Sequence, residues 1–307
     1  MRNLSLDYFK VILAFFVVCL HGGFFYDISE LVGYLFVHGL FRIAVPIFFI
    51  INGFFFYKIV SISDLKKWIK RIFILYIIWT IIYLPVMIYS LDPMQTIVRL
   101  FTGYFMLWYL VAMMLAGIML YFIKKNSDSF LLFFSLLLLI IGYVIQTIGN
   151  MHVFGESVDN FLNWGTLYCN FLFFGFPFFT MGYLIRKKNI TIDIKKGIFL
   201  GILFFGFLLI ESYFNYRISK EGVDILLSLF FLCPIIFLLI KQTYIQGSAK
   251  NIANFSTGVF LIHAYVLFFL RFTLDLDNTA LCLVTLFLSC MASLLLIQVN
   301  NRFKYLL

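Results

Sequence analysis

Charged residues are scarce in this sequence: Lys, Arg, Asp and Glu make up only 12% of its 307 residues. Such a low share argues against an ordinary soluble domain, in which about a quarter of the residues are charged. Cysteine is also rare, and the five cysteines form no CxxC pair. We therefore expect neither a disulfide framework nor a metal site, and we interpret the cysteines as small hydrophobic residues.

Linkers are missing as well. No stretch rich in Pro, Gly or Ser divides the chain, so we expect one integral-membrane domain, residues 1–307, with no appended soluble domain. The first apolar segment carries Asp7 and Lys10, and the bulky Val18 precedes Cys19. These features favour a retained helix over a cleaved signal peptide.

Apolar residues are abundant: 64% of the chain is hydrophobic, and the mean hydropathy is +1.04. This composition predicts an all-α polytopic membrane helix bundle of about ten transmembrane helices, with nine or eleven as alternatives. The expected spans lie near 6–25, 35–57, 72–91, 101–123, 130–149, 166–185, 198–214, 225–240, 257–272 and 279–299.

The basic residues predict the orientation of the bundle. If the N-terminus is cytoplasmic, 17 of the 23 Lys and Arg residues fall inside and four outside, while Lys10 and Arg42 lie within spans. The positive-inside rule favours this topology, and an even number of spans makes the C-terminus cytoplasmic too. We expect a multi-pass protein of the cytoplasmic (inner) membrane. The net charge of +9 then needs no nucleic-acid partner, although the inner cations could also hold an anionic substrate.

Ionisable side chains share one face of the first span. Lys10 and His21 are eleven residues apart, which in a helix leaves an angular offset of only about 20° and an axial separation of roughly 16 Å. Asp7 lies one turn before Lys10. Such groups are costly in a membrane and usually face a partner or a water-filled path. The alternative is that His21 only forms a hydrogen bond near the membrane interface.

The second span supplies the expected partners of this face. If the first two helices turn near residue 31, His21 lies level with Arg42, and Lys10 lies level with Asn52 and Gly53. Pro46 is in the same span, and we expect it to kink the helix beside a cavity unless it is purely structural.

A basic run opens the third span. Lys67, Lys70 and Arg71 share one face of its inner end, where they could bind phosphate groups. The inside-positive topology alone would also explain the cluster.

Several segments together resemble the acyltransferase-3 family of integral-membrane acyltransferases, which modify cell-surface glycans and lipids. Lys10 to His21 matches that family's basic-X10-His element, and Arg42 to Gly53 resembles its VPxFFxxSG segment. The later segments that follow the family's order are Lys67 to Trp79, Leu107 to Leu110, Phe174-Gly175 with Gly182-Tyr183, and Ser256 to His263. The chain departs from the family in having Lys10 where arginine is usual and Asn52 where serine is usual. Lysine keeps the charge but not the bidentate geometry.

The resemblance implies transfer of an acyl group, commonly acetyl from acetyl-CoA, to a hydroxyl of an outward-facing glycan or lipid-linked sugar. His21 would act as general base on that hydroxyl, with transient acylation of His21 as the alternative. Arg42 would stabilise the oxyanion. Lys10 would serve donor binding or balance the charge of Asp7. Asn52 and the basic run of Lys67, Lys70 and Arg71 would bind the donor.

Four further residues are weaker candidates for substrate binding. Glu211 could bind a sugar or pair with Arg217, and Trp108 and Tyr109 could stack on a ligand or simply pack. His263 could join the site or be a satisfied bundle histidine.

Two other functions remain open from the sequence. A transporter or flippase for a glycan or small metabolite would also need polar residues within its spans. A non-catalytic membrane subunit is the third possibility.

Overall fold

Helices make up almost all of the regular structure in residues 2–247 and 250–307, the part of the chain that the computed structural model describes. This confirms the expected all-α class. A two-residue strand pair, β1 (Arg2–Asn3) with β2 (Gln246–Gly247), is antiparallel. The helices are α1 (Leu4–Gly22), α2 (Glu30–Val37), η1 (Leu40–Ile43), α3 (Ala44–Phe56), α4 (Ile62–Ser90), α5 (Pro93–Thr102), η2 (Phe105–Leu107), α6 (Trp108–Ile123), α7 (Asp128–Asn150), α8 (Glu156–Leu162), η3 (Gly165–Leu167), η4 (Phe171–Gly175), α9 (Phe176–Lys187), α10 (Ile194–Ile218), α11 (Ser228–Gln242), α12 (Lys250–Thr273) and α13 (Asn278–Arg302).

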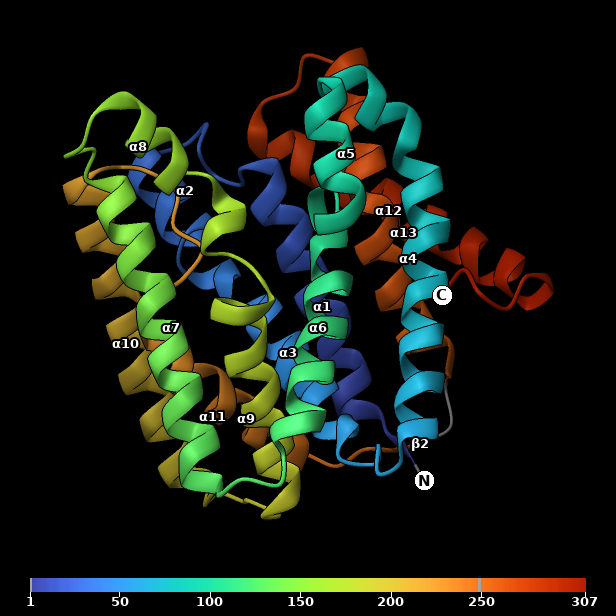
Figure 1. Ribbon diagram of the computed structural model, residues 1–307. Helices are drawn as coiled ribbons and strands as arrows, with labels where there is room; N and C mark the ends of the chain where they lie inside the picture. Colours follow the sequence, from blue (N-terminus) through green and yellow to red (C-terminus); the bar gives the residue numbers. More distant parts are fainter. Residues whose placement is uncertain (1, 248–249) are drawn as a thin grey trace.

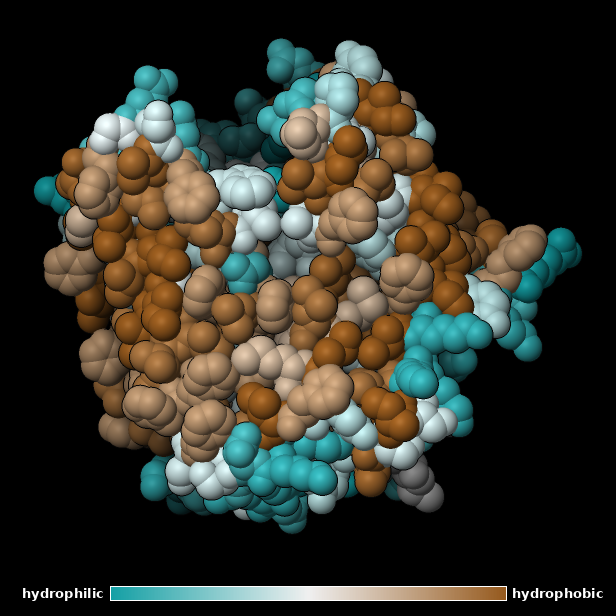
Figure 2. Space-filling model, viewed as in Figure 1, coloured by the Kyte–Doolittle hydropathy of each residue, from teal (hydrophilic) through white to brown (hydrophobic). Residues whose placement is uncertain are grey.

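The bundle is a multi-pass membrane architecture. Among the described residues, eight helical segments are long and apolar enough to cross a membrane: Leu4–Gly22, Glu30–Phe56, Ile62–Ser90, Pro93–Ile123, Asp128–Asn150, Ile194–Ile218, Lys250–Thr273 and Asn278–Arg302. The expected count of about ten also includes α11, a shorter apolar helix, and the span near 166–185, which consists of the π-helical η4 followed by α9. Figure 2 shows brown, apolar side chains over the middle of the molecule and teal, polar ones mainly at its top and bottom, with further teal side chains on the right.

Helix α1 lies inside the bundle, where it packs against α3, α11, α12 and α13. Its N-terminus is fixed beside β2, at the end of the molecule opposite to α5 and α8 (Figure 1). The Ser5 hydroxyl donates to the Thr243 carbonyl, and the Asn3 amide donates to the Lys241 carbonyl. These bonds hold the first turn of α1 against the end of α11.

Two spans are interrupted close to α1. The second span breaks at Gly39 into α2, the 3₁₀ turn η1 and α3. Pro46 lies in the first turn of α3, where proline is tolerated because its missing N–H would have had no helical partner. The expected kink is therefore a full break that precedes Pro46, and it places Arg42 on η1.

The other interrupted span breaks at Gly103, between α5 and α6. Gly103 has a φ of 91°, a left-handed conformation that favours glycine, and an added Cβ would strike the backbone of Trp108. The break allows α5 to turn back, so that η2 lies next to α12 and its Phe105 packs against His21 on α1.

Helices α3 and α9 approach each other very closely. An added Cβ on Gly53 would meet the carbonyl oxygen of Phe179, and one on Gly182 would meet the carbonyl oxygen of Ile50. Small residues allow such backbone approach between membrane helices. These two glycines therefore set the position of α3, which lies between the two cavities described below.

Candidate active site

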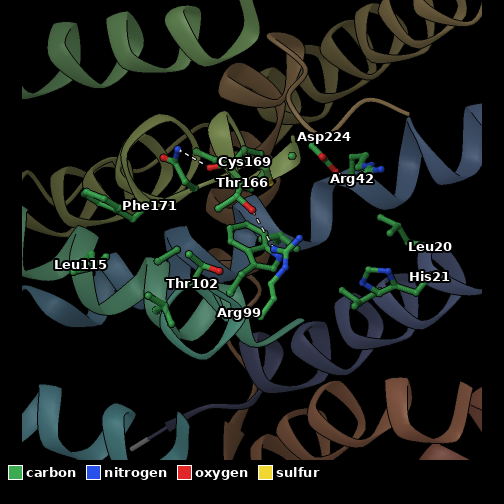
Figure 3. A pocket seen from close by; sticks show the side chains of 18 of the residues that line it. Leu20, His21, Arg42, Arg99, Thr102, Leu115, Thr166, Cys169, Phe171 and Asp224 are labelled. Atoms are coloured by element: carbon green, nitrogen blue, oxygen red, sulfur yellow. Dashed lines mark hydrogen bonds and ion pairs between the residues drawn. The ribbon is translucent and has the colours of Figure 1, made fainter. Parts of the chain in front are cut away.

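A cavity of about 490 Å³ opens beside the last turn of α1, and we call it the histidine cavity. Its polar lining includes His21, Arg42, Arg99, Thr166 and Asp224. Figure 3 shows that these side chains come from separate elements, with Arg42 beside Asp224 and Arg99 directed toward Thr166. His21 and Arg42, which the hairpin register places at one depth, thus line the same cavity.

His21 is packed between two other rings. The centroid of Phe105 lies 4.3 Å from the imidazole of His21, and His263 is stacked at 5.5 Å with an interplanar angle of 16°. His263 comes from α12 and is completely buried. The fold therefore brings together two histidines that are 242 residues apart in the sequence.

The hydrogen bonding of His263 indicates its tautomer. Its Nδ1 lies 2.7 Å from the carbonyl oxygen of Phe260, which can only accept, so Nδ1 carries the proton. Nε2 then carries the lone pair, and it has no hydrogen-bond partner among the described residues. His263 is therefore only half satisfied, in contrast to a fully bonded bundle histidine.

Arg42 is held on two sides. It forms an ion pair with Asp224, and its Nη2 lies 2.9 Å from Nδ1 of His38. The backbone N–H of Val223 also donates to His38 Nδ1 at 3.2 Å, so this nitrogen is an acceptor. Sequence analysis identified Arg42 but missed Asp224 and His38. No local pattern links Asp224 to a residue 182 positions earlier in the chain.

A larger cavity of about 1060 Å³ lies at the other end of α1, and we call it the lysine cavity. Lys10 lines it and is 3.2 Å from Asp7, which confirms the spacing argument for that pair. Three more cations line the same cavity: Lys58, Arg186 and Lys241. Sequence analysis counted these three among the inner cations but did not place them together, because they come from three different loops or helix ends.

One face of α1 contributes to both cavities. Lys10 lines the lysine cavity, and Val17, about two turns further along α1, lines the histidine cavity. Leu13 and Ala14 lie between them and are fully buried. On the neighbouring α3, the amide of Asn52 donates to the Tyr109 hydroxyl at 2.8 Å and to the Phe48 carbonyl. Asn52 and Tyr109 thus form a polar contact with each other within the apolar bundle, and neither lines the histidine cavity or the lysine cavity.

The basic run on α4 has a different position from the one expected for donor binding. Lys67, Lys70 and Arg71 are exposed and line neither cavity. The first turn of α4 is closed by a capping box between Ser61 and Asp64.

Glu211 also departs from its expected role. Its two carboxylate oxygens accept the backbone N–H groups of Leu227 and Ser228, so it caps the start of α11 instead of facing the histidine cavity or pairing with Arg217. Trp108, in contrast, lines the histidine cavity as a ligand-stacking residue would. In the described part of the chain, no group of three or more His, Cys, Asp or Glu residues could hold a metal ion.

In the described part of the chain, α1 of the multi-pass helix bundle thus contributes to a histidine-lined cavity and to a cationic cavity. Residues 3–298 match the acyltransferase-3 family, described as an acyltransferase domain. The chain belongs to this family, and the match covers nearly its whole length. This family membership supports a membrane acyltransferase.

The curated relatives carry different names. The chain is 26% identical over 306 residues to a protein named serine/alanine racemase from Enterococcus gallinarum. This alignment covers 87% of the present chain and 41% of the relative. It is 27% identical over 210 residues to an amino-acid racemase from Enterococcus faecalis, covering 60% of this chain and 29% of that relative. The chain thus spans less than half of the length of these relatives. No solved structure matches it.

Proposed function

We propose that this protein transfers an acyl group, with acetyl-CoA as the donor, to a hydroxyl of a glycan or lipid-linked sugar on the outer side of the membrane. The observation that carries the proposal is the placement of Lys10 and His21: one helix face supplies a cation to one cavity and an imidazole to the other. Family membership supports the same chemistry.

The orientation follows from charge. Among the described residues that line the lysine cavity, four are cations and one, Asp7, is acidic. Because positive residues concentrate on the cytoplasmic side, this cavity faces the cytoplasm of the inner membrane and the histidine cavity faces outward. Acyl-CoA is then available at the lysine cavity and the acceptor at the histidine cavity.

The lysine cavity suits the donor. Coenzyme A carries several phosphate negative charges, and Lys58, Arg186 and Lys241 can form charge-assisted hydrogen bonds to them. Lys10 is the one of these four cations that lies on α1. The apolar bundle beyond it, with the Asn52–Tyr109 pair at its side, would accommodate the pantetheine arm and its thioester.

His21 and Arg42 together supply the proton transfers and the charge that the acyl transfer needs. His21 accepts the proton of the acceptor hydroxyl while the oxygen attacks the thioester carbonyl carbon. The positive charge of Arg42 stabilises the oxyanion that forms. When the C–S bond breaks, the coenzyme A sulfur leaves and takes the proton from His21, so the imidazole is neutral again. Asp224 and His38 hold Arg42 in position throughout.

The cations of the lysine cavity can be tested against the basic run on α4. Substituting Arg186 or Lys241 by alanine is expected to raise the KM for acetyl-CoA roughly tenfold, since a hydrogen bond to a charged group contributes about 1.5–3 kcal/mol. The kcat should change little. Substituting the exposed Lys67 or Lys70 by alanine is the matched control and should leave KM unchanged. A larger effect of the Lys67 or Lys70 variant would move the donor site to α4.

Lys10 gives a separate test of charge against geometry. Lys10→Arg is expected to retain activity, because the side chain still pairs with Asp7 and keeps its charge, whereas Lys10→Ala should lose it. Steady-state turnover of acetyl-CoA by the three proteins measures this. Equal activity of all three would remove Lys10 from the mechanism.

A second candidate function is movement of a small metabolite across the membrane without acyl transfer. It is favoured by the similarity to proteins named for racemising amino acids, and by two cavities on opposite ends of one helix. A transporter needs no thioester donor. Uptake of a labelled amino acid into vesicles that lack acetyl-CoA, unaffected by His21→Ala, would favour this alternative.

A further inference from the structure

The charges that line the histidine cavity do not cancel. Asp224 balances the charge of Arg42 in an ion pair, but Arg99, the second guanidinium in the lining, has no carboxylate within ion-pair distance among the described residues. Its hydrogen bond goes to a neutral group, the hydroxyl of Thr166, at 3.1 Å. With neutral histidine, the cavity carries one uncompensated positive charge.

The position of Arg99 makes this charge available to a ligand. Arg99 lies on α5 and Thr166 on η3, so the two elements meet at the cavity lining (Figure 3). The Arg99 side chain is only partly buried. A guanidinium has five N–H donors in a fixed plane, and most of them remain for a planar or tetrahedral anion.

The other polar side chains near Arg99 bond to the backbone and give Arg99 no negative partner. Asn170 uses its amide to bond the carbonyls of Thr166 and Leu167 and its oxygen to cap Leu172 and Phe173. The Thr102 hydroxyl donates to the Val98 carbonyl. These side chains stabilise the wall of the cavity, and Arg99 is left as the group directed at a ligand.

We propose that the acceptor of the acyl group is anionic: a carboxylate or phosphate on the acceptor binds Arg99 while its hydroxyl reaches His21. This inference rests on the proposed function, because it names the substrate class of the same site. A partly desolvated cavity with net positive charge concentrates anions and strengthens charge-assisted hydrogen bonds to them. Arg99 is thus a specificity-determining residue, and Trp108 offers its ring to the sugar.

Ligand binding by the whole protein in lipid nanodiscs tests the inference without any acyl donor. The probes are methyl glucuronide, glucose 1-phosphate and neutral methyl glucoside, which separate a carboxylate, a phosphate and no charge. We expect at least one anionic probe to bind about tenfold or more tightly than the neutral one and to raise the Tm. Arg99→Gln should abolish the difference, and Arg99→Lys should restore part of it.

Arg217→Gln is the matched control, because Arg217 is exposed on α10 and lines neither cavity. It should bind the probes as the wild-type protein does. Equal binding of the three probes, no binding of either anion, or an unchanged preference in Arg99→Gln would overturn the inference. If the anion preference depends on Arg99 but no acyl transfer occurs, only the proposed function fails. If a neutral acceptor is acylated and Arg99→Gln has no effect, only this inference fails.

Discussion

Replacing His21 by alanine is expected to reduce acyl transfer by about 10²- to 10⁴-fold, the usual contribution of a positioned general base. The substitution removes the only imidazole that lines the histidine cavity in the described part of the chain. His263 stacks on His21 but is completely buried and does not line the cavity, so an acceptor hydroxyl in the cavity cannot reach it. Turnover of radiolabelled acetyl-CoA by the purified protein measures the effect.

His152→Ala is the matched control for this prediction. His152 is exposed and lies outside both cavities, so its loss should leave the rate within about twofold of the wild-type value. Thermal unfolding of both variants shows whether the bundle is intact. Wild-type turnover by a folded His21→Ala protein would remove His21 from the chemistry.

Gly53→Ala is expected to give the largest loss of stability from a single methyl group. The new Cβ would overlap the carbonyl oxygen of Phe179, a backbone atom that cannot rotate away as a side chain can. Overpacking of this kind costs about 1–3 kcal/mol, and a clash with backbone lies at or above the upper end of that range. We expect a lower Tm in detergent and a lower yield of folded protein.

Gly206→Ala provides the comparison. Gly206 lies within α10, and an added Cβ there has nothing within 4 Å. Alanine is the better helix former by about 0.8–1.0 kcal/mol, so this variant should be as stable as the wild type or more so. If both variants have the wild-type Tm, then α3 and α9 are not as closely packed as the structure indicates.

The class of fold could be predicted from sequence because its signals are local. Apolar runs of membrane-spanning length identify helices without any knowledge of their neighbours. Helical periodicity likewise placed Lys10 and His21 on one face of α1, and each lines one of the two cavities. The breaks at Gly39 and Gly103 were not predicted, since a continuous apolar run gives no sign that its helix stops and restarts.

Much of the candidate site could not be predicted, because it depends on contacts between distant segments. Asp224 reaches Arg42 from the loop before α11, and Arg186 and Lys241 converge on the lysine cavity from two other helices. The run with Lys67 and Lys70 was predicted to bind phosphate groups. A cluster of charge in the sequence, however, does not show whether that helix face lines a cavity. Composition identifies the cations, and packing decides which of them surround a cavity.

We expect a donor bound at the lysine cavity to acylate an acceptor in the histidine cavity. The most direct measurement reconstitutes the protein in vesicles in one known orientation and supplies radiolabelled acetyl-CoA on the Lys10 side only, with a hydroxyl acceptor on the His21 side. We predict labelled, acylated acceptor on the His21 side with wild-type protein and none with His21→Ala. Labelled acceptor at the same level with His21→Ala, or passage of an unmodified metabolite without acetyl-CoA in place of acylation, would contradict the account.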